Sequence, residues 1–233
     1  MKFLEKMLHN DRIIMYNAGE FANVTNELVA AVNWPKDVDM LSFSFNPFAP
    51  GGGFVRHDID GDYVIRYMFG CKTSALKPLG RPLKSSPIIA RAPKSVGEAL
   101  AVTKATLCDK SAAQRKRKGP AYQKELLNYL GSIKKGKVKS VLLFKNGKNV
   151  GIASMIDSVR LDGKKGSTFT WLWLDKKLPV AQYEDARFKA TKWVKDNAQE
   201  YMASANFDYD RESQRNDCRF GLKPYRIFFA RKK

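Results

Sequence analysis

The chain has 233 residues, and 44% of them are hydrophobic, so it can build a substantial core. This excludes a disordered tail, a disulfide-stabilised miniprotein and a fibrous chain. No apolar run reaches the roughly 18–20 residues that a membrane span needs, and the charges of Lys2, Glu5 and Lys6 argue against a signal peptide. Three cysteines without metal-ligand spacing and only two histidines predict reduced thiols, a cytoplasmic location and no metal site.

The charge is unevenly distributed along the chain. In total there are 42 Lys and Arg against 23 Asp and Glu, a net charge of +19. Residues 1–100 carry 12 basic and 10 acidic side chains, whereas residues 101–233 carry 30 and 13. Because each phosphate that a basic protein neutralises releases counterions, this excess predicts a nucleic acid or another polyphosphate as partner.

The N-terminal part is predicted to be an α/β region. Alternating or helical apolar spacing predicts, in chain order, a strand at 12–16, a helix at 21–32 and strands at 40–45 and 63–69. Four prolines and a glycine between residues 77 and 93 indicate an extended crossing segment or a linker. We place a boundary near residue 94, so that 1–94 is either a degenerate half or part of the same domain as 95–233.

Residues 95–233 show sharper signals. Ser95-Val96-Gly97-Glu98 is a capping box that begins a helix reaching Leu107, and Pro120 suits the first position of a second helix. An Asn146-Gly147 turn predicts a hairpin. The other elements are strands at 140–144, 149–156 and 168–174, a long helix at 183–203, and strands at 206–209 and 225–229. The short turns predict that the strands at 140–145, 149–156 and 168–174 are consecutive antiparallel neighbours.

Three segments resemble the GNAT (Gcn5-related N-acetyltransferase) superfamily. Residues 143–153 look like its central hairpin, and residues 169–175 look like its donor-binding strand. Phe207 to Ser213, followed by Arg219-Phe220-Gly221-Leu222-Lys223-Pro224, resembles the C-terminal signature of the FemAB-like branch. The resemblance covers about residues 95–233. It implies an α+β fold with a mixed, mostly antiparallel sheet flanked by helices, and an acyl- or aminoacyltransferase that takes its group from acyl-coenzyme A or aminoacyl-tRNA.

The connection between the donor strand and the long helix departs from the superfamily. Classical members hold the pyrophosphate of acetyl-coenzyme A on a glycine-rich loop, whereas residues 175–182 contain no glycine. Either Lys176 and Lys177 replace the lost amides with charge, or the donor is not coenzyme A. The candidate donor-binding residues are Trp171, Trp173, Asp175, Lys176, Lys177 and Arg211. The two tryptophans share one sheet face, as a stacking platform or as core under a helix.

The resemblance places the chemistry near the end of the following strand. There Asp208 or Asp210 would take the proton of the attacking amine, and Tyr209 would act as an acid toward the leaving group. The alternative is that both carboxylates cap a turn while Tyr209 packs in the core.

Two basic clusters flank the second helix and are candidate phosphate contacts. They comprise Arg115, Lys116, Arg117 and Lys118 on one side and Lys134, Lys135, Lys137 and Lys139 on the other. We therefore expect a transferase acting on an amine on or with a nucleic acid, either in DNA base modification of the phage type or in charged-tRNA-dependent transfer. The alternative is a non-catalytic nucleic-acid-binding protein on the same scaffold. A small cationic acceptor fits poorly, because the basic surface repels it.

Overall fold

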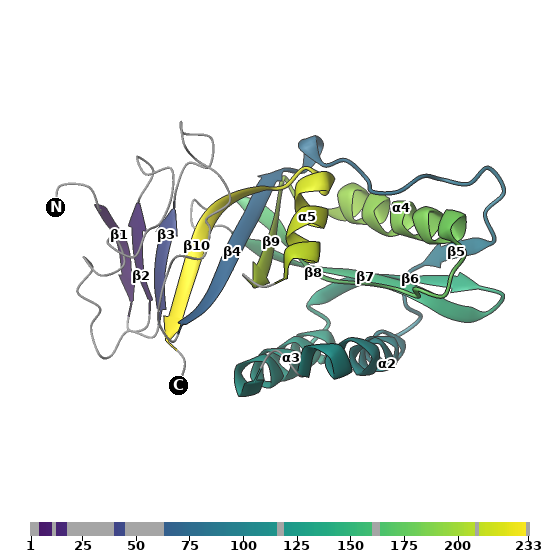
Figure 1. The fold of residues 1–233 in the computed structure, drawn as a ribbon, viewed down its shortest axis with the longest axis horizontal. Helices are drawn as coiled ribbons and strands as arrows, with labels where there is room; N and C mark the ends of the chain where they lie inside the picture. The colour runs from purple at the N-terminus through teal and green to yellow at the C-terminus, as the bar shows by residue number, and fades with distance from the viewer. Residues whose placement is uncertain are drawn as a thin grey trace. The chain divides into compact units, whose positions relative to one another are not determined.

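The computed structural model describes residues 5–10, 13–17, 40–44, 63–115, 119–159, 164–207 and 210–231. The chain divides into two compact units (Figure 1). The first unit combines Met1–Cys71 with Ala203–Lys233, and the second is Lys72–Met202. The boundary expected near residue 94 therefore falls inside the second unit. The helix expected at 21–32 lies outside the described residues.

The second unit is built on four strands in consecutive antiparallel order. They are β5 (Ile88–Arg91), β6 (Val138–Lys145), β7 (Lys148–Val159) and β8 (Lys165–Leu174). The turn between β6 and β7 has positive φ at Asn146 (49°) and Gly147 (75°), as an Asn-Gly hairpin requires. The predicted antiparallel order of the three central strands is confirmed.

Helices cover both faces of these strands. Helix α4 (Val180–Asn197) lies on one face, and helices α2 (Val96–Arg115) and α3 (Gly119–Lys134) lie on the other (Figure 1). The core on the α4 side is tightly packed, because Ala186 and Ala190 are fully buried and small enough to let the helix approach the sheet. Half of the predicted capping box is present: Ser95 Oγ accepts from the Glu98 amide at 3.1 Å, whereas the Glu98 carboxylate accepts from the Lys94 amide at 2.6 Å.

Two of these helices begin or end at residues other than those predicted from the sequence. Helix α2 continues to Arg115, well past Leu107. Helix α4 begins at Val180, directly after Pro179, and ends at Asn197. The expectation that it runs to Ala203 was wrong, because Tyr201–Phe207 pairs as strand β9.

The proline-rich segment is fastened to α4 along its length. Thr191 Oγ1 accepts from the Leu79 amide at 2.8 Å, and the Asp185 carboxylate accepts from the Leu83 amide at 2.9 Å and from the Ser86 hydroxyl. At Gly80 (φ 88°) the backbone passes so close to α4 that an added Cβ would lie 2.2 Å from the Glu184 carbonyl oxygen. The segment is thus an integral strap of the second unit and not a linker between domains.

The first unit contains a mixed sheet. Strands β1 (Glu5–Asn10) and β2 (Ile13–Asn17) are antiparallel, whereas β2 and β3 (Met40–Ser44) are parallel. Strand β10 (Lys223–Arg231) pairs antiparallel with β3 on one side and with β4 (Tyr63–Lys72) on the other. Together with the helices, the strand pairings of the two units give the predicted α+β class, in which the pairing is mixed but mostly antiparallel.

A helix in this unit was not predicted. Helix α5 (Arg211–Phe220) follows residues that the sequence analysis assigned to a strand and a turn. It buries only Gln214, Asp217 and Phe220, and its other side chains are polar, so it lacks the apolar stripe that identifies a helix. A short 3₁₀ helix, η1 (Thr73–Ala75), completes the described elements. None of the described helices is long and apolar enough to span a membrane.

Candidate active site

Strand β8 carries a β-bulge near its middle. The pairing with β7 shifts between Ser154, which faces Trp171, and Met155, which faces Phe169, so Thr170 is an extra residue. The Thr170 hydroxyl donates to the Ser154 carbonyl oxygen at 3.1 Å and thereby fixes the irregular backbone. Bulges interrupt the hydrogen-bond ladder and are frequent next to active sites, because they redirect backbone groups and side chains.

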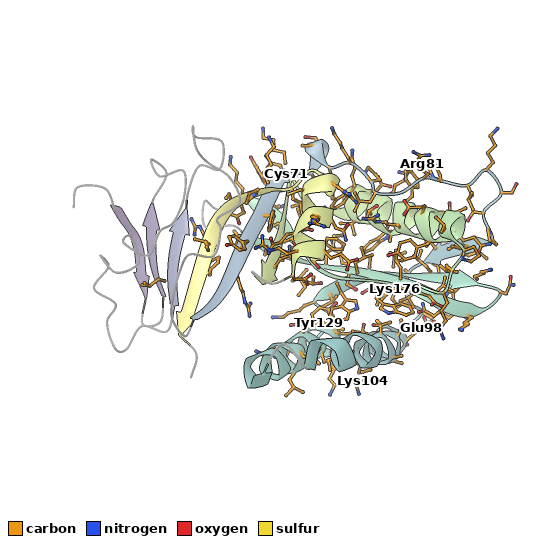
Figure 2. All side chains as sticks on the ribbon, viewed as in Figure 1. Cys71, Arg81, Glu98, Lys104, Tyr129 and Lys176 are labelled. Atoms are coloured by element: carbon orange, nitrogen blue, oxygen red, sulfur yellow. The ribbon has the colours of Figure 1, made fainter. Side chains whose placement is uncertain are left out.

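A group of hydroxyls lies beside this bulge, between the sheet and α3. Ser140 and Ser154 are buried and hydrogen-bonded at 2.8 Å, and the Tyr129 hydroxyl lies 3.5 Å from Thr170 Oγ1. Figure 2 shows Tyr129 in the layer between α3 and the strands. Burial raises the pKa of Tyr129, while hydrogen bonds from Ser154 and Thr170 act in the opposite direction. The Tyr129 hydroxyl therefore stays protonated and can donate a proton or a hydrogen bond.

Trp171 packs beneath the two helices. Its indole Nε1 donates to Thr106 Oγ1 at 3.2 Å, and its ring stacks on Tyr129 with centroids 6.0 Å apart and planes 24° apart. These contacts match the alternative in which Trp171 is core. Trp173, opposite Ile152 on β7, is partly exposed and stays a donor-binding prediction.

The connection from β8 to α4 is a defined turn. The Asp175 amide donates to the Val150 carbonyl at 3.0 Å, and Asp175 Oδ1 accepts from the Lys177 amide at 2.9 Å. This hydrogen bond commits one carboxylate oxygen of Asp175 to shaping the turn. Lys176 and Lys177 are exposed. A shallow depression of about 240 Å³ adjoins them, lined by Lys176, Leu178, Val180 and Tyr183.

The first turn of α4 has two unsatisfied features. Its N-cap residue is Pro179, which makes no side-chain cap, so the first amides of the helix have no capping acceptor. In the same turn, Gln182 Oε1 is buried and has no hydrogen-bond partner. A ligand with both an anionic group and an N–H or O–H donor would satisfy these groups. Phosphate and amide groups occur together in coenzyme A, so the residues present fit that cofactor.

The predicted catalytic residues are only partly described. Asp208 and Tyr209 lie outside the described residues. Asp210 is the N-cap of α5 and accepts from the Ser213 amide at 3.1 Å, which is the turn-capping alternative. Arg211 begins α5 and is exposed. Asp210 and Arg211 belong to the first unit, whereas β8 and the lysines that follow it belong to the second.

The predicted nucleic-acid contacts occupy both ends of α3. Arg115 is the last residue of α2, and Lys116, Arg117 and Lys118 lie outside the described residues. Lys134, Lys135 and Lys137 are exposed where α3 turns into β6. Lys139 differs from them, because its ammonium group pairs with Asp157 at 2.5 Å.

The sequence analysis missed a buried carboxyl in the first unit. Burial raises the pKa of Asp217 to about 7, although hydrogen bonds from Ser204 and Asn206 favour its charged form. No sequence signal identifies Asp217, because it stands among polar residues and an aspartate is ordinarily exposed. In the part of the chain that the structure describes, no three His, Cys, Asp or Glu residues are grouped to hold a metal.

Comparison with known proteins gives similarity in fold. No protein-family model and no curated protein matches the sequence. A functionally unknown conserved protein from Staphylococcus epidermidis matches with a TM-score of 0.49 and 13% identity over 99% of this chain and 94% of that one. A GCN5-related N-acetyltransferase from Kribbella flavida matches with a TM-score of 0.44 and 14% identity, over 95% of this chain and 81% of that one. A tandem GNAT protein from the clavulanic acid biosynthesis pathway matches with a TM-score of 0.46 and 12% identity, over 88% of this chain and 66% of that one.

Proposed function

We propose that the protein is an acyltransferase of the GNAT type that transfers an acyl group to an amine. The observation that carries this proposal is the strand β8, bulged at Thr170 and followed by a lysine-bearing turn at the N-terminus of α4. The buried, unpartnered Gln182 Oε1 in the first turn of that helix supports a ligand there. The order hairpin, donor strand and long helix, on which the resemblance rests, is present in the described residues.

The donor's phosphates would bind at the start of α4. Lys176 and Lys177 supply positive charge, and the uncapped helix terminus adds free amides with a partial positive charge. Gln182 Oε1 would accept from an amide or hydroxyl of the donor. From this point the donor would extend along β8 and bring its acyl carbonyl to the bulge.

The acyl carbon would then react where the ladder is interrupted. When bound, coenzyme A supplies a thioester whose C–S bond breaks as the C–N bond to the acceptor amine forms. Backbone amides of β8 near Trp171 would stabilise the oxyanion on the carbonyl oxygen. The attacking amine must give up one proton and the leaving thiolate must take one, and the resemblance assigns these steps to Asp208 or Asp210 and to Tyr209.

The wider proposal is that the acceptor or the donor belongs to a nucleic acid. The net charge of +19 supports it, because a polyphosphate is the partner that such a charge attracts. DNA base modification and charged-tRNA-dependent transfer both fit. The second candidate, a non-catalytic nucleic-acid-binding protein on the same scaffold, is favoured by the glycine-free connection at 175–182.

Donor binding is the decisive test. Acetyl-coenzyme A and an aminoacyl-tRNA are titrated by calorimetry into the wild type, into K176A/K177A, and into the control K77A/K84A, which removes two exposed lysines from the strap. The first pair should raise the dissociation constant at least tenfold, about 1.4 kcal/mol, and the control should leave it unchanged. Failure of the wild type to bind either donor would remove the main support of the catalytic proposal and favour the non-catalytic alternative.

A further inference from the structure

The two structural units differ sharply in charge. The second unit, Lys72–Met202, contains 28 Lys and Arg but only 10 Asp and Glu, a net charge of +18. The first unit contains 14 and 13, a net charge of +1. Nearly all of the excess positive charge of the protein therefore lies in the unit that contains β8, although that unit is only a little longer than half of the chain.

Five carboxylates among the described residues of the second unit form ion pairs within that unit. Glu98 pairs with Arg91 at 2.5 Å, and Asp157 pairs with Lys139 at 2.5 Å. Asp185, Glu184 and Asp196 pair with cations of α4 itself at 3.4, 3.7 and 2.6 Å. These pairs neutralise part of the basic charge locally and leave the remaining exposed lysines without enough carboxylates to balance them.

One group of exposed lysines gathers at the end of the sheet where β6 and β8 begin. Lys134 ends α3, and Lys135 and Lys137 flank Gly136 in the turn into β6. Across β7, Lys164 and Lys165 stand at the start of β8, where Lys165 is opposite Val159, whereas Val138 at the start of β6 is opposite Ile156. The two strand starts are therefore about 10 Å apart across the sheet and about 10 Å apart along it. We call these five residues the lysine surface: Lys134, Lys135, Lys137, Lys164 and Lys165.

The backbone under this surface is fixed. The Lys135 and Lys137 amides donate to the carbonyls of Gly131 and Ser132 at 3.1 and 3.0 Å, and Gly136 takes the left-handed conformation at φ 66°. On the β8 side, the Lys164 ammonium group lies 3.2 Å from the Tyr201 hydroxyl and 5.3 Å from the centre of its ring. A lysine at a helix C-terminus also balances the helix dipole, but this explains only Lys134.

We propose that the lysine surface binds the phosphate backbone of a nucleic acid. An anionic membrane is the less suitable partner, because surface binding to lipid also needs an apolar face that enters it. The exposed large hydrophobic residues among the described positions are instead scattered over separate elements: Ile89, Val96, Leu127, Val159, Val180 and Tyr225. Binding through phosphates would be strongly salt-dependent and would carry little sequence preference.

This surface and the donor turn lie at opposite ends of one strand. Strand β8 spans ten residues, about 30 Å, from Lys165 to Leu174, and the bulge at Thr170 lies midway. A nucleic acid held at the first end and an acyl donor held at the second would both approach the bulge. This last step rests on the proposed function, whereas phosphate binding by the lysine surface does not.

The test compares two triple variants of equal charge. K134A/K135A/K137A removes part of the lysine surface, and K77A/K84A/K94A removes three exposed lysines elsewhere in the same unit. Anisotropy of a fluorescein-labelled random-sequence duplex, and of one of its strands alone, is measured over a series of salt concentrations. The first variant should flatten the slope of log affinity against log salt by about 0.9 for each duplex phosphate that it no longer neutralises, and by about 0.7 for each phosphate of the single strand. The control should leave that slope within about 0.3 of the wild type, since its three lysines neutralise no phosphate.

A further variant, K164A/K165A, tests the two lysines of the lysine surface at the start of β8. Circular dichroism melting verifies that each variant is folded. Acetyl-coenzyme A binding is measured on the same samples and should be unchanged, which separates this proposal from the donor site. Equal loss of affinity in both triple variants would overturn the proposal, because it would show a response to net charge alone. Binding to phosphatidylserine vesicles but not to either oligonucleotide would overturn it in favour of a membrane surface.

Discussion

Asn206 of β9 donates a hydrogen bond of 2.5 Å from its side-chain amide to the buried carboxyl of Asp217 in α5. The pKa of Asp217 is raised to about 7, first by burial and then by the nearby charge of Asp210, against the hydrogen bonds from Ser204 and Asn206. The group is therefore close to half-protonated at neutral pH, in a position seven residues from a predicted catalytic carboxylate.

This predicts a stability that falls as the pH rises. In the unfolded chain Asp217 loses its proton near pH 4, whereas in the folded protein it keeps the proton until about pH 7. The Asp217 carboxyl therefore makes its full contribution to the free energy of unfolding below pH 4. This contribution, up to about 4 kcal/mol, is lost as the pH rises to 7. Urea unfolding between pH 5 and pH 8 measures it, with Asp217→Asn as the variant that should remove most of the slope. A slope that Asp217→Asn leaves intact would assign the dependence to another group.

The strap on α4 depends on a buried carboxylate. Asp185 is fully buried and accepts from Leu83 and Ser86, with the Lys189 ammonium group 3.4 Å away. Asp185→Ala should lower the free energy of unfolding by about 3 kcal/mol or more, because it leaves the Leu83 amide without its acceptor and the Lys189 ammonium group without its counter-charge. Asp196→Ala is the control on the same helix, since it breaks an exposed pair with Lys192 and should cost less than about 1 kcal/mol. Similar costs for both, by urea unfolding, would show that the strap contributes little.

Gly80 and Gly131 should respond oppositely to alanine. An added Cβ at Gly80 would lie 2.2 Å from the Glu184 carbonyl oxygen, and the residue has φ 88°. Gly80→Ala should therefore destabilise the protein by about 2 kcal/mol or more. At Gly131, in α3, an added Cβ meets nothing within 4 Å, so alanine should stabilise by up to about 1 kcal/mol through helix propensity. Thermal melts of the two variants give the comparison, and a tolerated Gly80→Ala would mean that the strap can lift from α4.

Trp171 distinguishes packing from donor binding. Its contacts with Thr106 and Tyr129 predict that Trp171→Ala costs about 3–5 kcal/mol of stability. Trp171→Phe keeps most of the apolar area and loses the hydrogen bond, so it should cost about 1 kcal/mol and leave donor affinity unchanged. A Trp171→Phe protein of normal stability that fails to bind its donor would assign the ring to the donor site.

Local signals in the sequence predicted much of the second unit. The Asn146-Gly147 turn and the strand at 168–174 depend on neighbouring residues alone, and the structure has both. The bulge at Thr170 could not be predicted, because it depends on the register against β7. Asp185 likewise looks like an ordinary helix-surface residue until a strap about 100 residues earlier in the chain covers it.

The first unit shows the limits of local patterns more clearly. Helix α5 is polar on most of its surface, and its best sequence signals are its ends: Asp210 caps the first turn, and Gly221 adopts φ 105° after the last. Those two residues were assigned to chemistry and to a family motif instead. Lys176 and Lys177 were selected by charge and spacing and stay predictions. The buried oxygen of Gln182 and the buried carboxyl of Asp217 were missed, because burial decides their chemistry.

Strand β10 pairs with both β3 and β4. One sheet therefore combines strands that precede the second unit in the sequence with a strand that follows it. On the ribosome, β3 and β4 emerge long before β10, and until it arrives each has an unpaired edge. The second unit is one continuous stretch whose central strands pair with their neighbours in sequence, so it can fold while the chain is still being made. A chain truncated before residue 223 should therefore keep a protease-resistant second unit while its β3 and β4 edges stay exposed. In the complete chain, these edges are where chaperones or aggregation act until β10 is in place.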